Sequence, residues 1–194
     1  MEDSRRRGRR VLLLIAAIFL VPVVLAFALY YGNVWRPSGS SSKGELIVPA
    51  RPLDAAGLRG ADGAAAGGDL LQGKWSIVYV GDGACDADCR ATLVYARQSR
   101  LALNNEMTRV QIVMLATANC CEASIGQHVP GIRVVDASSP DAAPLIAQFP
   151  ADRRAQTLYI VDPLGNLMMR HEAAQTSKDL LTDLKKLLKL SHIG

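Results

Sequence analysis

The chain has 194 residues, 49% of them hydrophobic, which is enough for one packed domain of ordinary size with appendages. Its formal net charge is +4, but five arginines and two acidic residues within residues 1–10 supply +3 of it. The remainder is nearly neutral and has neither a basic patch nor a recognition motif, which argues against nucleic-acid binding. We find no glycine-rich phosphate loop and no nucleophile elbow, so the sequence does not indicate a nucleotide-binding protein or a serine hydrolase.

Residues 11–31 carry no charge and predict a single transmembrane helix, because a helix of that length crosses the ~30 Å hydrocarbon core of a bilayer. The positive-inside rule makes residues 1–10 a cytoplasmic basic tail and sends the rest of the chain across the membrane. The alternative is a cleaved secretory signal, since Ala26-Phe27-Ala28 is typical of a cleavage site. We favour the anchor, because the apolar run continues beyond that site with aromatic residues.

Both interpretations export the C-terminal part of the chain. We expect a single-pass protein of the bacterial inner membrane with its C-terminal domain in the periplasm, and the mitochondrial intermembrane space is the alternative. In such an oxidising compartment the four cysteines are candidates for disulfides, redox thiols or copper ligands.

Residues 32–69 are rich in Ser, Gly, Ala and Pro and predict a flexible linker, within which residues 45–48 are a candidate edge strand. The compact domain is expected over residues 70–194. In chain order its predicted elements are a strand at 75–80, a helix at 90–107, strands at 110–116 and 132–135, a short helix at 141–149, a hairpin of strands at 157–161 and 167–170, and a final helix.

The final helix is predicted to begin at Thr176 or Ser177. Its apolar face and its polar positions are clear: the first comprises Leu180, Leu181, Leu184, Leu187 and Leu188, and the second Lys178, Asp183, Lys185, Lys186 and Lys189. We expect this helix to pack on the sheet. The order of elements predicts an α/β fold, a thioredoxin-like domain with a central mixed sheet flanked by helices.

Cys85 and Cys89 lie between the first strand and the first helix of this domain. A helix N-terminus favours thiolates there, and Arg90 assists, whereas Asp86 and Asp88 oppose. If both cysteines lay within the helix, their Cβ atoms would be ~5–6 Å apart, too far for a disulfide but suitable for a shared Cu(I) ion. If Cys85 lies in the loop, a disulfide forms readily, so both copper binding and redox exchange remain open.

The segment VYVGDGACDADC at residues 78–89, the segment YIVDPLG at residues 159–165 and the N-terminal anchor resemble the Sco/SenC group of thioredoxin-like proteins. The resemblance implies a role in assembling the dinuclear copper centre of cytochrome c oxidase, as a copper chaperone, a thiol reductant or both. It makes Cys85 and Cys89 the redox-active residues and the Cu(I) ligands. The implied partner is an oxidase subunit or another copper or thiol assembly protein.

The chain departs from the family pattern at two positions. Arg90 replaces the proline that usually follows the second cysteine, and the family's histidine ligand corresponds to about Arg154. Because a guanidinium stays protonated, it is not a metal ligand. The usual ligand set is therefore incomplete: another residue supplies the third ligand, the site has two thiols, or copper transfer has been lost.

Cys120 and Cys121 follow the second strand, and parallel strands end at the same edge of a sheet, so all four sulfurs are expected at one end of the domain. These two cysteines and His128 are possible additional metal ligands. Adjacent cysteines bridge each other only with strain, so we expect one of them to pair with Cys85 or Cys89. The alternative is that both are buried hydrophobic residues. His171 and His192 are predicted on the exposed surface.

The sequence thus predicts a membrane-anchored periplasmic assembly factor for cytochrome c oxidase that acts through Cys85 and Cys89. The alternatives are a general periplasmic thiol-disulfide oxidoreductase and a non-catalytic interaction module with a structural disulfide. The main hypothesis requires that the sulfurs of Cys85 and Cys89 are reachable from solvent.

Overall fold

A computed structural model of the chain describes residues 2–32, 42–121, 125, 129–152, 154–172, 177–191 and 193. The chain divides into two compact units, Met1–Ser41 and Ser42–Gly194. Each unit is considered by itself.

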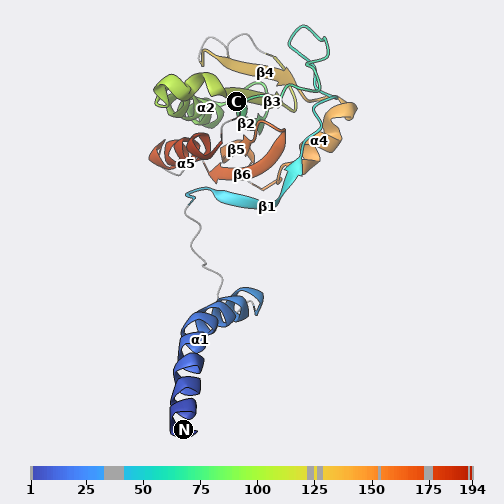
Figure 1. The fold of residues 1–194 in the computed structure, drawn as a ribbon. Helices are drawn as coiled ribbons and strands as arrows, with labels where there is room; N and C mark the ends of the chain where they lie inside the picture. The colour runs from blue at the N-terminus through green and yellow to red at the C-terminus, as the bar shows by residue number, and fades with distance from the viewer. Residues whose placement is uncertain are drawn as a thin grey trace. The chain divides into compact units, whose positions relative to one another are not determined.

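The first unit contains one helix, α1 (Glu2–Tyr31), which includes Pro22 (Figure 1). Its segment Arg6–Leu29 is long and apolar enough to cross a membrane. The apolar side chains from Val11 to Leu29 are largely exposed, as lipid-facing residues are. The predicted transmembrane segment is therefore a helix of suitable length and character.

The second unit is built on a six-stranded mixed sheet. Its strands are β1 (Glu45–Pro52), β2 (Trp75–Gly81), β3 (Val110–Ala116), β4 (Ile132–Asp136), β5 (Thr157–Val161) and β6 (Asn166–Glu172), in the order β1-β6-β5-β2-β3-β4. The pairs β2–β3 and β3–β4 are parallel, and the other three are antiparallel. Strands β2 and β5 are buried almost throughout, as expected for central strands made of continuous apolar residues. The predicted mixed sheet is confirmed.

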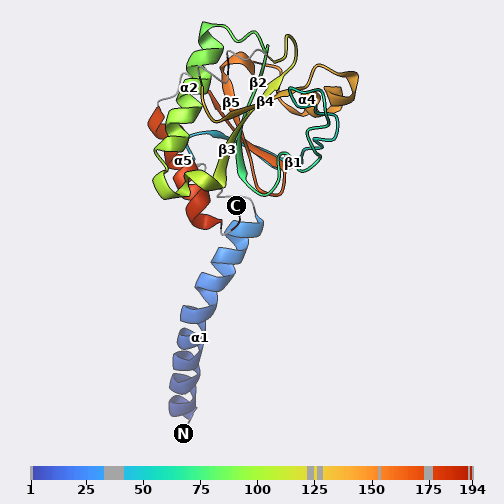
Figure 2. The same ribbon diagram turned by 90° about the horizontal axis from the view of Figure 1, so that it is seen from above.

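Helices cover both faces of this sheet (Figures 1 and 2). On one face lie α2 (Ala87–Leu101) and α5 (Ser177–Leu190), and on the other lies α4 (Ala143–Gln148). The predicted leucine stripe is confirmed, since Leu180, Leu184 and Leu188 of α5 are buried in the core. The short 3₁₀ helices are η1 (Asn104–Arg109), η2 (Pro140–Ala142) and η3 (Arg154–Gln156).

Several boundaries differ from the predictions by a few residues, and two differ by more. The helix expected over residues 90–107 ends at Leu101 and is followed by η1. The compact domain begins at Ser42 instead of near residue 70. Residues 42–69 join it because β1 pairs with β6 and because apolar side chains of this segment, including Leu53 and Leu58, are buried in the core beside α4. Residues 33–41 of the predicted linker lie outside the described residues.

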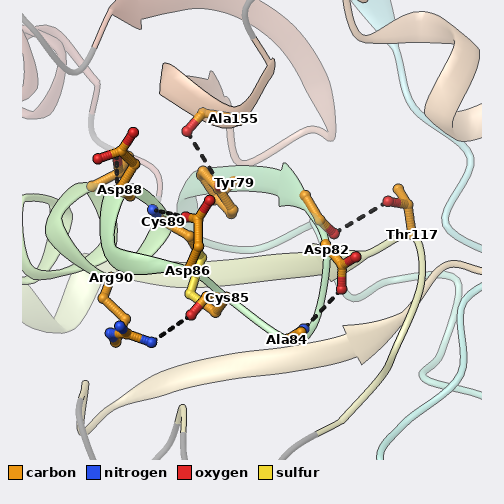
Figure 3. The surroundings of a disulfide bond; sticks show 12 residues. Tyr79, Asp82, Ala84, Cys85, Asp86, Asp88, Cys89, Arg90, Thr117 and Ala155 are labelled. Carbon is orange, nitrogen blue, oxygen red and sulfur yellow. Dashed lines mark hydrogen bonds between the residues drawn. A yellow bond between two sulfur atoms is a disulfide. The ribbon is translucent and has the colours of Figure 1, made fainter.

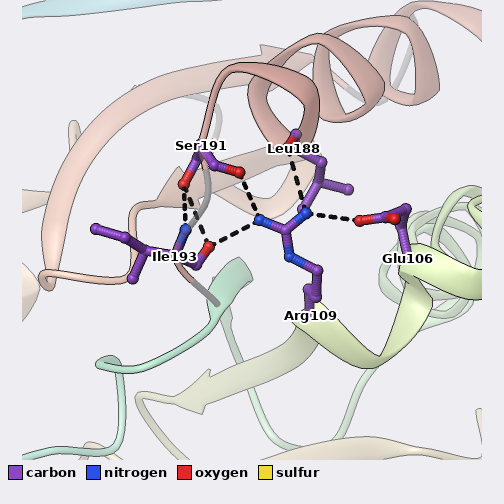
Figure 4. Close-up of polar contacts among 5 residues, drawn as sticks. All are labelled: Glu106, Arg109, Leu188, Ser191 and Ile193. Atoms are coloured by element: carbon purple, nitrogen blue, oxygen red, sulfur yellow. Dashed lines mark hydrogen bonds and ion pairs between the residues drawn. The ribbon is translucent and has the colours of Figure 1, made fainter.

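Arg109, the last residue of η1, fixes the end of α5 (Figure 4). Its guanidinium donates to the backbone carbonyls of Leu188 (3.2 Å), Ser191 (2.6 Å) and Ile193 (3.0 Å) and pairs with Glu106 at 2.6 Å. The carbonyls at a helix C-terminus have no intrahelical partner, so a cation there stabilises the helix end. This contact holds α5 on the face of the sheet that carries the cysteines.

Candidate functional site

The loop that follows β2 is held against the loop that follows β3. The Asp82 carboxylate accepts hydrogen bonds from the Ala84 N–H (2.9 Å) and, with both oxygens at 3.0 Å, from the Asn119 side-chain amide. These donors lower the pKa of Asp82, since they favour the ionised form. The Gly83 N–H donates to the Ala118 carbonyl at 2.8 Å. The two loops thus form one hydrogen-bonded unit.

Glycine at position 83 is required by this close approach. A Cβ added there would lie 2.4 Å from the carbonyl oxygen of Asn119, a backbone atom with no room to move away. Any larger residue at position 83 would separate the two loops.

Cys85 lies in the loop and Cys89 in the first turn of α2, and the two form a disulfide with a Cα–Cα distance of 5.2 Å. Asp86 caps the helix, because its side chain accepts a hydrogen bond from the Cys89 N–H at 2.8 Å. Cys85 has φ +42°, a left-handed conformation that non-glycine residues seldom adopt. Residues in this conformation cluster at functional sites. The chain therefore uses the arrangement in which only the second cysteine is helical.

Polar groups surround this disulfide (Figure 3). Arg90 donates through Nη1 to the carbonyl of Cys85 at 2.7 Å, so its positive charge lies beside the pair. The Tyr79 hydroxyl donates to the Ala155 carbonyl at 3.2 Å. Burial raises the pKa of Tyr79 to about 12, and the charges of Asp86 and Asp88 add to the rise. In the reduced protein, the helix N-terminus and Arg90 would favour thiolates and the two carboxylates would oppose them.

The expected solvent access to these two sulfurs is not found in the disulfide form. Cys85 and Cys89 are each only 3% exposed. They belong to the same apolar core as Leu93 of α2 and Ile125 and Val129, which follow β3 in the chain. Their position between strand and helix agrees with the prediction, but a partner does not reach them without movement of the surrounding loops.

The second cysteine pair differs from the prediction in its connectivity. Cys120 bonds to Cys121, and neither is joined to Cys85 or Cys89. The expectation of a cross-pair failed because each of the first two cysteines already has a partner four residues away. Both Cys120 and Cys121 are half-buried, so they are not the fully buried hydrophobic residues of the alternative interpretation.

The structure does not test the predicted extended metal site as a whole. His128 lies outside the described residues, and so does His192. Within the part of the chain that the structure describes, no group of three or more His, Cys, Asp or Glu side chains is placed to hold a metal ion. The additional ligation predicted for Cys120 and Cys121 together with His128 therefore stays a prediction.

Arg154 has a structural contact set in place of the expected histidine. Its guanidinium donates to the carbonyls of Ile146 (3.0 Å), Phe149 (2.6 Å) and Pro150 (3.1 Å), at and just beyond the C-terminal end of α4. This position therefore stabilises a helix end and supplies no metal ligand.

His171 and Asp183 form a buried pair that the sequence predictions missed. His171 is 0% exposed and Asp183 1% exposed, with 3.2 Å between Nε2 and Oδ2. The same Asp183 oxygen accepts hydrogen bonds from the N–H groups of Lys43 and Gly44, both at 2.8 Å. The predictions of an exposed His171 and of Asp183 as an outward polar position of α5 were therefore wrong.

A sequence signal for His171 was present. Burial alternates along β6, where Leu167, Met169 and His171 all point inward, so the period of a strand places His171 inside. For Asp183, three residues after Leu180 and next to Leu184, the helical period gave the same indication.

The first unit has a helix long and apolar enough to cross a membrane, and the second is a thioredoxin-like domain with a disulfide where its central strand meets a helix. The family described as "Transmembrane-like, thioredoxin-like, C-terminal domain" matches residues 75–191, and the corresponding "Transmembrane-like, N-terminal domain" matches residues 2–33. The chain belongs to this family. No curated protein matches it.

Solved structures of Sco proteins share the fold. Apo Sco1 from Thermus thermophilus is 18% identical, with a TM-score of 0.58 over 77% of this chain and 99% of that one. Copper-bound yeast Sco1 is 17% identical, with a TM-score of 0.59 over 79% and 96%. Copper-bound ScoI from Bradyrhizobium japonicum is 16% identical, with a TM-score of 0.53 over 71% and 98%. The predicted Sco/SenC-like, thioredoxin-like fold is thereby confirmed.

Proposed function

We propose that this protein is a membrane-anchored thiol–disulfide exchange protein that serves the assembly of cytochrome c oxidase, with Cys85 and Cys89 as its redox pair. The observation that carries the proposal is the Cys85–Cys89 disulfide between β2 and the capped N-terminus of α2. A thiolate at a helix N-terminus is both a competent nucleophile and a good leaving group in disulfide exchange.

The exchange proceeds through a mixed disulfide. In the reduced protein, one thiolate attacks a disulfide sulfur of the target and displaces the other target sulfur as a thiolate. The second cysteine of the pair then attacks the mixed disulfide, which closes Cys85–Cys89 and releases the second target thiol. Two electrons pass to the target, and the protein ends in the disulfide form that the structure describes.

Copper transfer is the second candidate, and the shared fold with two copper-bound Sco proteins favours it. Reduced Cys85 and Cys89 are soft donors that suit Cu(I), which they would hold between two thiolates and pass on by ligand exchange. The fit is partial, because Arg154 is engaged with backbone carbonyls and the described residues offer no third ligand. We therefore place thiol exchange first.

The arginines before α1 support an orientation with the N-terminus in the cytoplasm and the domain in the periplasm of a bacterial inner membrane. The partner is then an oxidase subunit whose copper-binding cysteines must be reduced, or another copper or thiol assembly protein. In an assembly role, the protein delivers electrons or copper to its partner in a one-to-one ratio and does not turn over a small substrate.

The test uses the full chain in detergent, reduced and mixed with a disulfide-bonded copper-site subunit of cytochrome c oxidase. We expect thiols to appear on the subunit as Cys85–Cys89 closes, measured by alkylation and mass spectrometry. The chain with Cys85→Ser and Cys89→Ser is the control and should transfer less, because only Cys120 and Cys121 remain to donate electrons. Equal transfer by the control would exclude the proposal.

Two further measurements separate the alternatives. Exchange with unrelated disulfide proteins at the same rate would indicate a general thiol-disulfide oxidoreductase. Normal oxidase assembly in cells that carry the same double variant would indicate an interaction module with a structural disulfide. A Cu(I) titration of the reduced chain that depends on Cys85 and Cys89 would favour the copper chaperone.

A further inference from the structure

The two disulfides differ in their access to solvent. Cys85 and Cys89 are each 3% exposed and belong to the apolar core, whereas Cys120 and Cys121 are half-buried. Disulfide exchange requires that the attacking sulfur reach its target along the S–S axis, so a protein dithiol reaches the second pair more readily than the first.

We propose that Cys120 and Cys121 form a second redox pair, through which the buried Cys85–Cys89 pair exchanges electrons with dithiols of other proteins. This inference rests on the proposed function, since it requires Cys85 and Cys89 to be redox-active. The proposal assigns a role to Cys120 and Cys121, which take no part in the exchange reaction of Cys85 and Cys89.

The hydrogen bonds between the two loops carry the proposal. Thr117 donates to the Gly81 carbonyl through both its N–H (2.9 Å) and its hydroxyl (3.2 Å), and Gly83 donates to the Ala118 carbonyl. The Asn119 amide reaches the Asp82 carboxylate. Consecutive residues of both loops are thus joined up to the residue before Cys120.

Cys85 and Cys120, one from each pair, lie within two residues of the last of these contacts in the sequence. Gly83 and Asn119 are so close that a Cβ on Gly83 would lie 2.4 Å from the Asn119 carbonyl oxygen. Cys120 directly follows Asn119, and Cys85 follows Gly83 by two positions. In the proposed path, a shift of either loop brings the Cys120 sulfur to Cys85, which is closer in sequence to Gly83 than Cys89 is.

The transfer balances in electrons, and the two protons that Cys120 and Cys121 lose when they attack are taken up by the released thiolates of Cys89 and Cys85. A dithiol of a second protein first reduces Cys120–Cys121 and is itself oxidised to a disulfide. The Cys120 thiolate then attacks the sulfur of Cys85, which breaks the Cys85–Cys89 bond and releases the Cys89 thiolate. Cys121 attacks Cys120 next, re-forms the Cys120–Cys121 disulfide and releases Cys85 as a thiolate. Two electrons have moved inward, and the same steps run in reverse for oxidation.

The test measures the rate at which thioredoxin, as the protein dithiol, reduces Cys85–Cys89 in the oxidised full chain in detergent. Alkylation and mass spectrometry follow each cysteine separately. In the chain with Cys120→Ser and Cys121→Ser, we expect this rate to fall at least about tenfold while the equilibrium between the Cys85–Cys89 pair and thioredoxin stays the same. An unchanged rate would overturn the proposal.

A trapping variant tests the contact between the pairs without removing both cysteines of either one. The chain with Cys89→Ser and Cys121→Ser retains only Cys85 and Cys120, and mild oxidation should join them within one molecule. The chain with Cys89→Ser, Cys120→Ser and Cys121→Ser is the control, in which only intermolecular disulfides form. Absence of the internal cross-link would contradict the proposed path.

The two proposals fail in different ways. If thioredoxin reduces Cys85–Cys89 equally fast with and without Cys120 and Cys121, only the second redox pair is excluded. If Cys85–Cys89 stays oxidised in every variant, including the parent chain, the proposed function is excluded and the relay with it.

Discussion

Two buried sites lie on the α2 and α5 side of the sheet, and they are built in opposite ways. The Cys85–Cys89 disulfide joins residues four positions apart in a loop and the helix that follows it. The His171–Asp183 pair joins β6 to α5, and Asp183 also binds the backbone of Lys43 and Gly44, which lie 140 and 139 residues earlier in the chain.

This difference indicates a different role for each site. The disulfide is local, so it can open and close while the strand and helix around it remain in place. The histidine-carboxylate site is made entirely of contacts between distant segments, so loss of one partner loosens several of them at once. We expect the first site to control reactivity and the second to control stability.

The largest effect is expected from replacing both Cys85 and Cys89 by serine, which should eliminate thiol transfer by this pair. Because the disulfide closes a very short loop, its removal should cost only about 2 kcal/mol in the free energy of unfolding. Thiol-transfer assays and urea unfolding of the full chain in detergent measure the two effects. Complete unfolding of this variant would contradict the expectation that the disulfide controls reactivity and the His171–Asp183 pair controls stability.

Asp183→Ala should have the converse effect, because it leaves His171 and two backbone N–H groups buried without their acceptor. We expect a loss of about 3–5 kcal/mol in the free energy of unfolding, measured by urea denaturation. Asp179→Ala, in the first turn of the same helix, is the matched control and should lose no more than about 1 kcal/mol. Similar losses in the two variants would show that the His171–Asp183 pair contributes no more to the free energy of unfolding than a carboxylate in the first turn of α5.

Arg154→Ala removes the cation that contacts three carbonyls around the end of α4. We expect a loss of about 2 kcal/mol in stability and no change in the rate of thiol exchange. Arg133→Ala is the control, because Arg133 is exposed and makes one carbonyl contact, to Ala66 at 3.3 Å. A change in thiol exchange or in Cu(I) affinity would instead place Arg154 in the functional site.

Asp86→Ala removes the cap of α2 and should cost about 1 kcal/mol in stability. Asp86→Asn retains a side-chain acceptor and should keep most of the stability, since asparagine caps helices as well as aspartate does. Any effect on exchange that appears in both variants arises from the lost carboxylate charge, because the first lacks the cap and the second retains it. Thermal unfolding and thiol-exchange rates distinguish the two causes.

The smallest effect concerns the contact between the two cysteine-bearing loops. Because the folded pKa of Asp82 is lowered, its stabilisation is fully present above the unfolded value of 3.8 and is lost as the pH falls through the folded value. Hydrogen exchange at the Gly83 N–H, corrected for intrinsic rates, should lose protection over that range. Asp82→Asn should remove this pH dependence, and a wild-type-like pH profile in that variant would contradict the assignment.

The parts of the molecule set by local pattern were predictable. The continuous apolar segments at β2 and β3 and the cysteines that follow β2 located the site, since strand period and helix capping depend on neighbouring residues. The burial of His171 followed from the alternation along β6, but the identity of its partner did not. That partner depends on how α5 packs across the sheet, which no short window of sequence contains.

The contact between Asp183 and Gly44 has a consequence for biosynthesis. The segment next to the anchor is made first, yet its partners β6 and α5 are made last. Strand β1 therefore stays unpaired until nearly the whole polypeptide has been synthesised. A chain truncated before β6 would leave β1 without its pairing strand, and unpaired strands are vulnerable to aggregation.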